Sequence, residues 1–181
     1  MTETSTRIVV LVGSLRADSL NRRIAEALRV WAPDGVTVEI ADALHDLPFY
    51  NEDLDTETVP PAAATLRALV AGADGVLAVT PEYNGTMPAV LNNAIDWLSR
   101  PYGVGAIRGK RFGVVGATPT PYGGKWAHEH ALRSAGIAGA EVVEGALVSQ
   151  SALEVDVLTD PEVLERFRGA LRSLSAYRPA A

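Results

Sequence analysis

Two polar segments, residues 13–21 and 80–88, carry the residue types best suited to bind a ligand. Each follows an apolar, β-branched run and precedes a helical pattern, so we expect both at the carboxyl edge of one parallel sheet, where open α/β sheets bind ligands. The first segment reads Gly13-Ser14-Leu15-Arg16-Ala17-Asp18-Ser19-Leu20-Asn21, and its hydroxyls and cation suit a phosphate. The second reads Thr80-Pro81-Glu82-Tyr83-Asn84-Gly85-Thr86-Met87-Pro88, and its polar groups on a proline-stiffened backbone suit the edge of a flat ring.

The first segment combines several phosphate-binding groups around the start of a predicted helix. Gly13 permits a tight turn, hydroxyl groups can donate hydrogen bonds, and an arginine supplies a fork-shaped cation. Backbone amides at a helix start complete an anion site. Read alone, Ser19 or Asn21 is better explained as a helix N-cap, but the whole cluster favours a phosphate. The candidate phosphate ligands are Ser14, Arg16, Ser19, Leu20 and Asn21.

The second segment and a third loop are candidates for contacts with the ring. The second segment supplies Pro81, Glu82, Tyr83, Asn84 and Gly85; its alternative is a simple surface turn with the tyrosine packed on the core. The third loop leaves the predicted strand that ends at Thr118, and the backbone amides of its glycines could face a ring carbonyl. Its alternative is a rigid connector before a helix. The candidates in this loop are Thr118, Tyr122, Gly123 and Gly124.

Composition limits the chemistry that the chain can perform. The 181 residues are 48% hydrophobic, which suits one domain over residues 1–181, with residues 1–6 expected to be disordered. There is no cysteine, so redox chemistry requires a bound cofactor. A net charge of −6 argues against nucleic acid or an anionic membrane as partner, since both need a basic surface. No signal peptide or apolar run long enough to span a bilayer is evident, so we expect a cytoplasmic protein.

Strand and helix patterns alternate along the chain and predict a three-layer α/β/α fold. Right-handed crossovers favour a five-stranded parallel sheet in the order 2-1-3-4-5, which places the first two segments on either side of the point where the chain reverses direction. A long loop is predicted from Asp42 to Thr58. The predicted strands are 7–12, 36–40, 75–80, 112–118 and 141–148, the last interrupted by Gly145; the predicted helices are 21–31, 60–71, 90 to about 100, 125–135 and 161–176.

The motifs also resemble a known family. Gly-Ser-Leu-Arg-x-x-Ser-x-Asn at 13–21, Pro-Glu-Tyr-Asn-Gly at 81–85 with Asn-Ala-Ile-Asp-Trp at 93–97, and Leu-Pro-Phe-Tyr-Asn-Glu-Asp-Leu at 47–54 are similar to the NADPH-dependent FMN reductases, which include quinone, azo-dye and chromate reductases. The resemblance extends from about residue 8 to residue 135. It departs from the family pattern at Pro119-Thr120-Pro121-Tyr122 and at Lys125-Trp126-Ala127-His128.

The resemblance implies a flavodoxin-like homodimer, often a dimer of dimers, with FMN at the subunit interface. It assigns the phosphate to segment 13–21, the isoalloxazine to residues 81–85, and the pyrimidine side of the ring to Gly123 and Gly124. The implied reaction is ping-pong: NADPH or NADH passes hydride to the flavin N5, and a quinone, azo compound, chromate or similar small acceptor then takes two electrons. No side chain need serve as a catalytic acid or base, since the cofactor carries the chemistry. Glu82 is a candidate for a contact with a partner subunit.

The same sequence features also suit other functions and sites. A flavodoxin-type electron carrier or an FMN-binding regulatory protein would share the fold and the cofactor. We expect no metal site, because His128 and His130 are two positions apart on a predicted helix and His45 stands alone in a loop; each is better explained as solvated or locally hydrogen-bonded. Residues 47–54 form a substrate-side flap, a dimer contact or an ordinary loop over the sheet edge.

Overall fold

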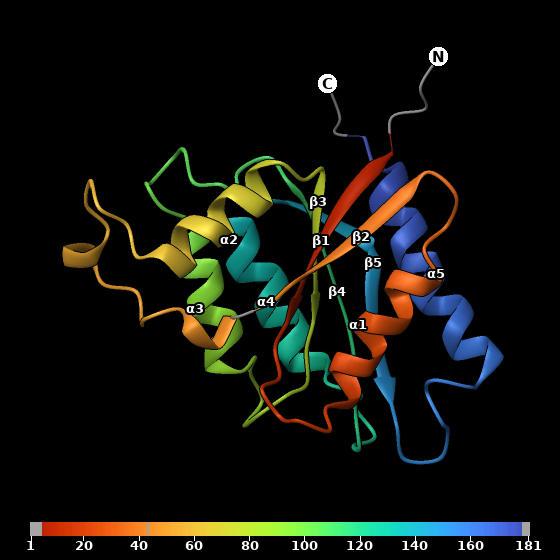
Figure 1. The fold of residues 1–181 in the computed structure, drawn as a ribbon. Coiled ribbons are helices and arrows are strands. Elements are labelled where there is room, and N and C mark those ends of the chain that lie inside the picture. The colour runs from red at the N-terminus through yellow and green to blue at the C-terminus, as the bar shows by residue number, and fades with distance from the viewer. Residues whose placement is uncertain (1–4, 43, 179–181) are drawn as a thin grey trace.

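The computed structural model describes residues 5–42 and 44–178. Five parallel strands form one sheet in the order β2-β1-β3-β4-β5, which confirms the predicted topology. Helices cover both faces, α1 and α5 on one side and α2, α3 and α4 on the other (Figure 1). The elements are β1 (Thr6–Val12), α1 (Leu20–Val30), β2 (Val36–Ala41), α2 (Pro61–Ala71), β3 (Gly75–Val79), α3 (Ala89–Leu98), β4 (Arg111–Thr118), α4 (Lys125–Ile137), β5 (Glu141–Ser151) and α5 (Pro161–Ala176).

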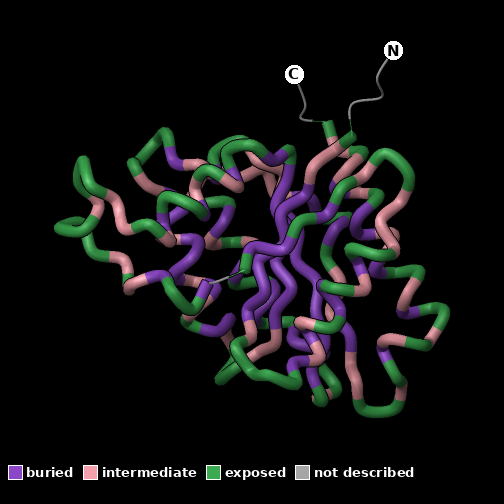
Figure 2. The backbone as a smooth tube through the Cα atoms, in the orientation of Figure 1, coloured by how far each residue is buried: buried purple, intermediate pink, exposed green. Residues whose placement is uncertain are grey.

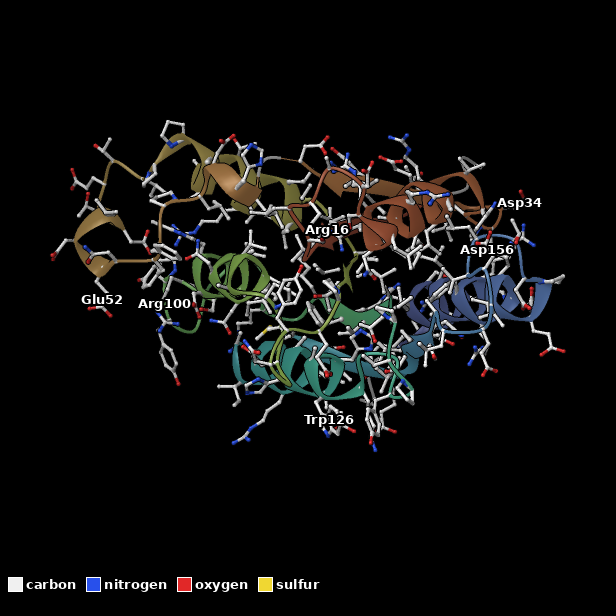
Figure 3. All side chains as sticks on the ribbon, turned by 90° about the horizontal axis from the view of Figure 1, so that it is seen from below. Arg16, Asp34, Glu52, Arg100, Trp126 and Asp156 are labelled. Carbon is white, nitrogen blue, oxygen red and sulfur yellow. The ribbon has the colours of Figure 1, made fainter. Side chains whose placement is uncertain are left out.

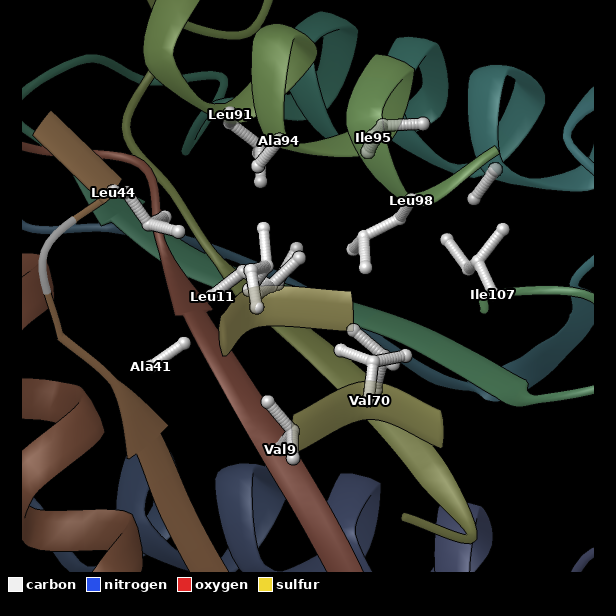
Figure 4. Close-up of a cluster of buried hydrophobic side chains, with 14 of the residues drawn as sticks. Val9, Leu11, Ala41, Leu44, Val70, Leu91, Ala94, Ile95, Leu98 and Ile107 are labelled. Atoms are coloured by element: carbon white, nitrogen blue, oxygen red, sulfur yellow. The ribbon is translucent and has the colours of Figure 1, made fainter. Parts of the chain in front are cut away.

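Alternating strand residues supply two separate hydrophobic cores. In β1, Val9 and Leu11 face α2 and α3, whereas Ile8 and Val10 face α1 and α5, and all four are completely buried. This is the consequence of the two-residue period of a strand that is covered on both faces. Figure 4 shows the first of these cores, and Figure 2 shows that burial is concentrated in the central strands while the connecting loops are exposed.

The observed elements differ from the predicted ones mainly at their ends. β1 begins at Thr6, whose amide donates to the Gly35 carbonyl at 2.8 Å, so the expected disordered segment 1–6 is wrong at its last residue; residues 1–4 lie outside the described part. β5 extends three residues beyond the prediction, and its register with β4 shifts between Phe112 and Val114, beside the predicted interruption at Gly145. The loop after β2 contains two short 3₁₀ turns, Leu44–Asp46 and Glu52–Leu54.

None of the helices in the described residues is long and apolar enough to cross a membrane.

Candidate functional site

The loops after β1 and β3 lie side by side, as the strand order predicted. Val12 pairs with Val79, and the Gly13 amide donates to the Val79 carbonyl at 2.9 Å. A Cβ atom on Gly13 would lie 2.3 Å from the Thr80 hydroxyl oxygen, so only glycine allows this approach. Figure 3 views the carboxyl edge of the sheet, where Arg16 lies at the β1–α1 loop and Trp126 projects outward from α4.

The β1–α1 loop presents unpaired hydrogen-bond donors at the start of α1. Ser19 is the N-cap, and its hydroxyl oxygen accepts the Arg22 amide at 3.1 Å, so the N-cap role is real while its hydroxyl hydrogen stays available. The next two amides, of Leu20 and Asn21, have no acceptor among the described residues. The guanidinium of Arg16 is exposed, and it too has no hydrogen-bond partner among the described residues.

The side chain of Asn21 has a structural role that the sequence did not reveal. It is 3% exposed; its Nδ2 donates to the Ala117 carbonyl at 2.9 Å, and its Oδ1 accepts the Ala117 amide at 3.0 Å. Both ends of the side chain are therefore used to tie α1 to β4. Only the backbone amide of Asn21 is left for a ligand.

The β3–α3 loop contains a two-residue hairpin turn. Tyr83 and Thr86 exchange backbone hydrogen bonds at 3.0 and 3.1 Å, and the residues between them, Asn84 and Gly85, have φ values of 53° and 73°. Two positive φ values define a type I′ turn, for which Asn-Gly is the favoured pair. Tyr83 remains 48% exposed, so it does not pack on the core as the simple-turn alternative required.

Three hydrogen bonds hold this loop against α4. The Glu82 carboxylate accepts the Ala127 amide at 3.0 Å, His128 Nε2 contacts the Thr80 carbonyl oxygen at 3.0 Å, and the Thr86 hydroxyl contacts His130 Nδ1 at 2.6 Å. Glu82, a candidate for a partner contact, thus binds the first turn of α4 within the same chain. A carboxylate at this position also complements the positive end of the helix dipole.

His128 is buried rather than solvated. It has no exposed surface, and its Nδ1 lies 2.7 Å from the Ser149 hydroxyl of β5. Burial lowers the pKa of His128 below its usual value of 6.5, while the hydrogen bond to the Thr80 carbonyl and the nearby Glu82 carboxylate oppose this shift. Because a carbonyl oxygen only accepts, Nε2 carries the hydrogen, and in the neutral ring Nδ1 accepts from Ser149.

The β4–α4 loop approaches β5 at the first of its two consecutive glycines. Gly123 and Gly124 have φ values of 61° and 88°, and a Cβ atom on Gly123 would lie 2.7 Å from the Gln150 carbonyl carbon. Thr118 is buried, and its hydroxyl bonds that of Thr120 at 2.9 Å. Tyr122 and Trp126 are 57% and 45% exposed, with ring centroids 4.5 Å apart. The loop therefore presents an exposed aromatic pair beside two glycines.

Residues 47–54 form an arm that extends away from the sheet edge instead of covering it (Figure 1). Its base is fixed to α3, because the Pro48 carbonyl accepts from Trp97 Nε1 at 2.8 Å and from Asn93 Nδ2 at 3.0 Å. Phe49 is 79% exposed. A cleft of about 560 Å³ lies between this arm, the β3–α3 loop and α3, and its lining includes Phe49, Tyr50, Tyr83 and Asn84.

A partly buried ion pair fixes the chain immediately after this arm. Arg67 of α2 donates to both oxygens of Asp55 at 2.7 Å, and its Nε donates to the Trp97 carbonyl at 2.9 Å. The Arg67 guanidinium holds the pKa of Asp55 below its usual value. The arm is thus anchored at both ends, although the sequence predicted only a long loop.

Several of these contacts carried no local signal in the sequence. Asn93 is a polar residue within a predicted helix, yet it is buried, and its Oδ1 accepts the Tyr50 amide at 2.8 Å. His128 has the spacing of a polar residue on a solvated helix. Asn21, His128 and Asn93 each bind backbone groups at least 43 positions away in the sequence. No cluster of three or more metal-binding side chains occurs among residues 5–42 and 44–178.

The chain is similar to known oxidoreductases over most of its length. It is 45% identical to the quinone reductase of Pseudomonas putida over 126 residues, which are 70% of this chain and 67% of the relative. It is 34% identical to the NAD(P)H:quinone oxidoreductase of Solanum tuberosum over 182 aligned positions, covering 94% of this chain and 91% of the relative.

A solved structure with a similar fold is the flavoenzyme NAD(P)H:(acceptor) oxidoreductase FerB of Paracoccus denitrificans. It has a TM-score of 0.83 and 30% identity, with 94% of this chain and 95% of that chain covered. The family described as NADPH-dependent FMN reductase matches residues 6–154. Since this match includes both strand-end loops and the arm, and extends beyond the region of resemblance seen in the sequence, the chain belongs to the NADPH-dependent FMN reductase family.

Proposed function

We propose that this chain is an FMN-dependent NAD(P)H oxidoreductase that reduces quinones. The observation that supports this most strongly is the pairing of two loops at one sheet edge. The first loop keeps phosphate-binding donors free, and the second is a rigid turn of suitable chemistry for a polar ring. Family membership and relatives named as quinone reductases agree with this function.

The donor set of the β1–α1 loop fits the FMN phosphate. The two free amides of Leu20 and Asn21 and the hydroxyl of Ser19 lie at a helix start, and Arg16 adds a cation. Ser14 and Arg16 also border a cleft of about 540 Å³. A dianionic phosphate gains from both the amides and the helix dipole at such a position.

The isoalloxazine is assigned to the β3–α3 and β4–α4 loops. Residues 81–85 would line the ring, and the Gly123 and Gly124 region would approach its pyrimidine side, with Thr118 and Tyr122 beside it. When bound, FMN supplies the two-electron chemistry, accepting hydride from NAD(P)H and giving electrons to the acceptor in a ping-pong cycle. The protein residues bind and orient the reactants; none is assigned as an acid or base.

We also propose that two copies of the chain assemble around this edge. Exposed aromatic side chains surround it, with Phe49, Tyr83, Tyr122 and Trp126 exposed by 79%, 48%, 57% and 45%. Aromatic residues are enriched in protein interfaces. Sedimentation of the holoprotein should give a dimer or a dimer of dimers.

Anaerobic mixing with NADPH tests the enzyme against the electron-carrier alternative. The enzyme should bleach the oxidised flavin band rapidly, and parallel lines in double-reciprocal plots with a benzoquinone should show ping-pong turnover. Bound FMN without bleaching would support a carrier, and a protein that binds no FMN would exclude both. A screen of quinones, azo dyes, chromate and free FMN under the same conditions would rank the acceptors.

A further inference from the structure

We propose that His128 and Glu82 form a clasp that holds the β3–α3 loop in the shape required to bind the flavin ring. The inference rests on the proposed assignment of this loop to FMN. His128 reaches from α4 to the Thr80 carbonyl at the start of the loop, while Glu82 reaches from the loop to the Ala127 amide at the start of α4. In both hydrogen bonds α4 supplies the donor, but one side chain reaches out from the helix and the other from the loop, so the two segments are joined at two points.

Two glycines without side chains leave room for the imidazole ring of His128. A Cβ atom on Gly116 of β4 would lie 2.9 Å from His128 Nε2 and 2.2 Å from the Thr80 oxygen, and one on Gly124 would lie 3.1 Å from Nε2. Any larger residue at Gly116 would therefore break the bond between the histidine and the loop. On its other side the ring is fixed by the Ser149 hydroxyl at 2.7 Å.

One buried side chain thus connects the structures that surround the proposed ring site. Thr80 begins the β3–α3 loop, Gly124 ends the β4–α4 loop, and Ser149 belongs to β5. His130 adds an exposed contact from α4 to Thr86, at the far side of the hairpin turn. We assign His128 as a positioning residue, since its polar atoms are engaged by protein groups and none is left for a substrate.

Two amide variants separate positioning from packing. The amide nitrogen of His128→Gln can occupy the place of Nε2 and keep the Thr80 bond, whereas the shorter side chain of His128→Asn can keep only the Ser149 contact. We expect His128→Asn to weaken FMN and riboflavin equally, by about tenfold, because the binding-competent loop conformation becomes a minor one. His128→Gln should stay within about threefold of the parent protein. Equal losses in the two variants would show a packing role and overturn the proposal.

Hydrogen exchange of the full chain, with and without FMN, tests the clasp independently of catalysis. The reporters are the Ala127 amide, bound by Glu82, and the Tyr83 and Thr86 amides of the turn. His128→Asn should accelerate exchange at all three by about tenfold, and unchanged exchange would overturn the proposal. If the protein binds no FMN, the proposed function fails while these reporters still decide whether the clasp exists.

A variant at a partly exposed position tests the clasp even if the substitutions at the buried His128 prevent folding. Glu82→Ala removes one half of the clasp at a partly exposed position and should accelerate exchange at Tyr83 and Thr86. Unchanged exchange at these two amides would contradict the clasp. Glu129→Ala is the matched control, because Glu129 is an exposed acid of α4 that faces Lys125 at 3.8 Å, and it should change none of the reporters.

Discussion

The β1–α1 and β3–α3 loops leave the same sheet edge but use their polar groups in opposite ways. In the first, the amides of Leu20 and Asn21 and the Arg16 side chain have no hydrogen-bond partner among the described residues. In the second, Thr80, Glu82 and Thr86 all bind α4. The difference indicates that the first loop recognises charge with free donors, whereas the second provides a fixed shape.

The Asn21 side chain is the one group of the first segment that differs from this pattern among the residues just compared. Asn21 joins the free-donor loop to β4 through a buried side chain, so the loop is rigid at its root and open at its tip. Substitutions at the root should therefore change stability, and substitutions at the tip should change ligand binding.

The largest effect is expected for Asn21→Ala. It would leave the amide and the carbonyl of Ala117 buried without partners, and each unpaired group costs about 1 to 3 kcal/mol. The free energy of unfolding should fall by roughly 3 kcal/mol in urea titrations of the FMN-free protein. Ser14→Ala, at the tip of the same loop, should change it by less than about 0.5 kcal/mol. Similar losses in the two variants would contradict the division between root and tip.

Arg16→Ala should do the opposite of Asn21→Ala, because it should weaken FMN binding without changing stability. Loss of a charge-assisted hydrogen bond of about 2 kcal/mol would weaken FMN roughly thirtyfold. Riboflavin, which has no phosphate, should bind as before, and the free energy of unfolding should be unchanged. Fluorescence titration with both flavins measures this, with Arg23→Ala on the exposed side of α1 as control. Equal weakening of FMN and riboflavin would remove Arg16 from the phosphate site.

His128, which binds the second loop from α4, should make the stability of the protein depend on pH. Its pKa in the folded protein is below the value of 6.5 that it would have in the unfolded chain, so the unfolded chain binds the proton first as the pH falls. The stability contributed by the neutral His128 should therefore be fully present above pH 6.5. Below pH 6.5 the free energy of unfolding should decrease by up to about 1.4 kcal/mol per pH unit, until the pKa of His128 in the folded protein is reached. The difference between parent and His128→Gln, measured by urea titration from pH 7.5 to 4.5, isolates this contribution. Parallel curves would contradict it.

The smallest effect is expected at the turn of the second loop. Gly85→Ala places a side chain at a φ of 73° with no atom within 4 Å of the new Cβ, so the cost is backbone strain alone, about 1 kcal/mol. FMN should bind a few times more weakly, as measured by fluorescence. Asn84→Gly, at a φ of 53°, removes strain instead and should be neutral or slightly stabilising. If alanine is tolerated without any loss, the shape of this turn is not what binds the ring.

The sequence predicted the regular elements and the candidate loops well but missed the contacts between them. The apolar periodicity of the strands acts over a few neighbouring positions and was interpreted correctly, whereas the type I′ turn at 84–85 was not predicted although Asn-Gly is a local signal for it. His128 and Asn93 looked like ordinary polar helix residues, because their partners lie 48 and 43 positions away. Such partners cannot be read from spacing along the chain.

By itself, the sequence determined that a parallel α/β sheet would bring two polar loops together at one edge, because strand period, loop composition and crossover handedness are local properties. Only the tertiary structure decided which polar groups remain free. Ser19 and Asn21 occur in one motif, yet the Ser19 side chain caps a helix, whereas the Asn21 side chain is hydrogen-bonded to β4. Glu82 and His128, far apart in the chain, become opposite halves of one contact. The availability of a donor depends on every group packed around it, and that packing exists only in the folded protein.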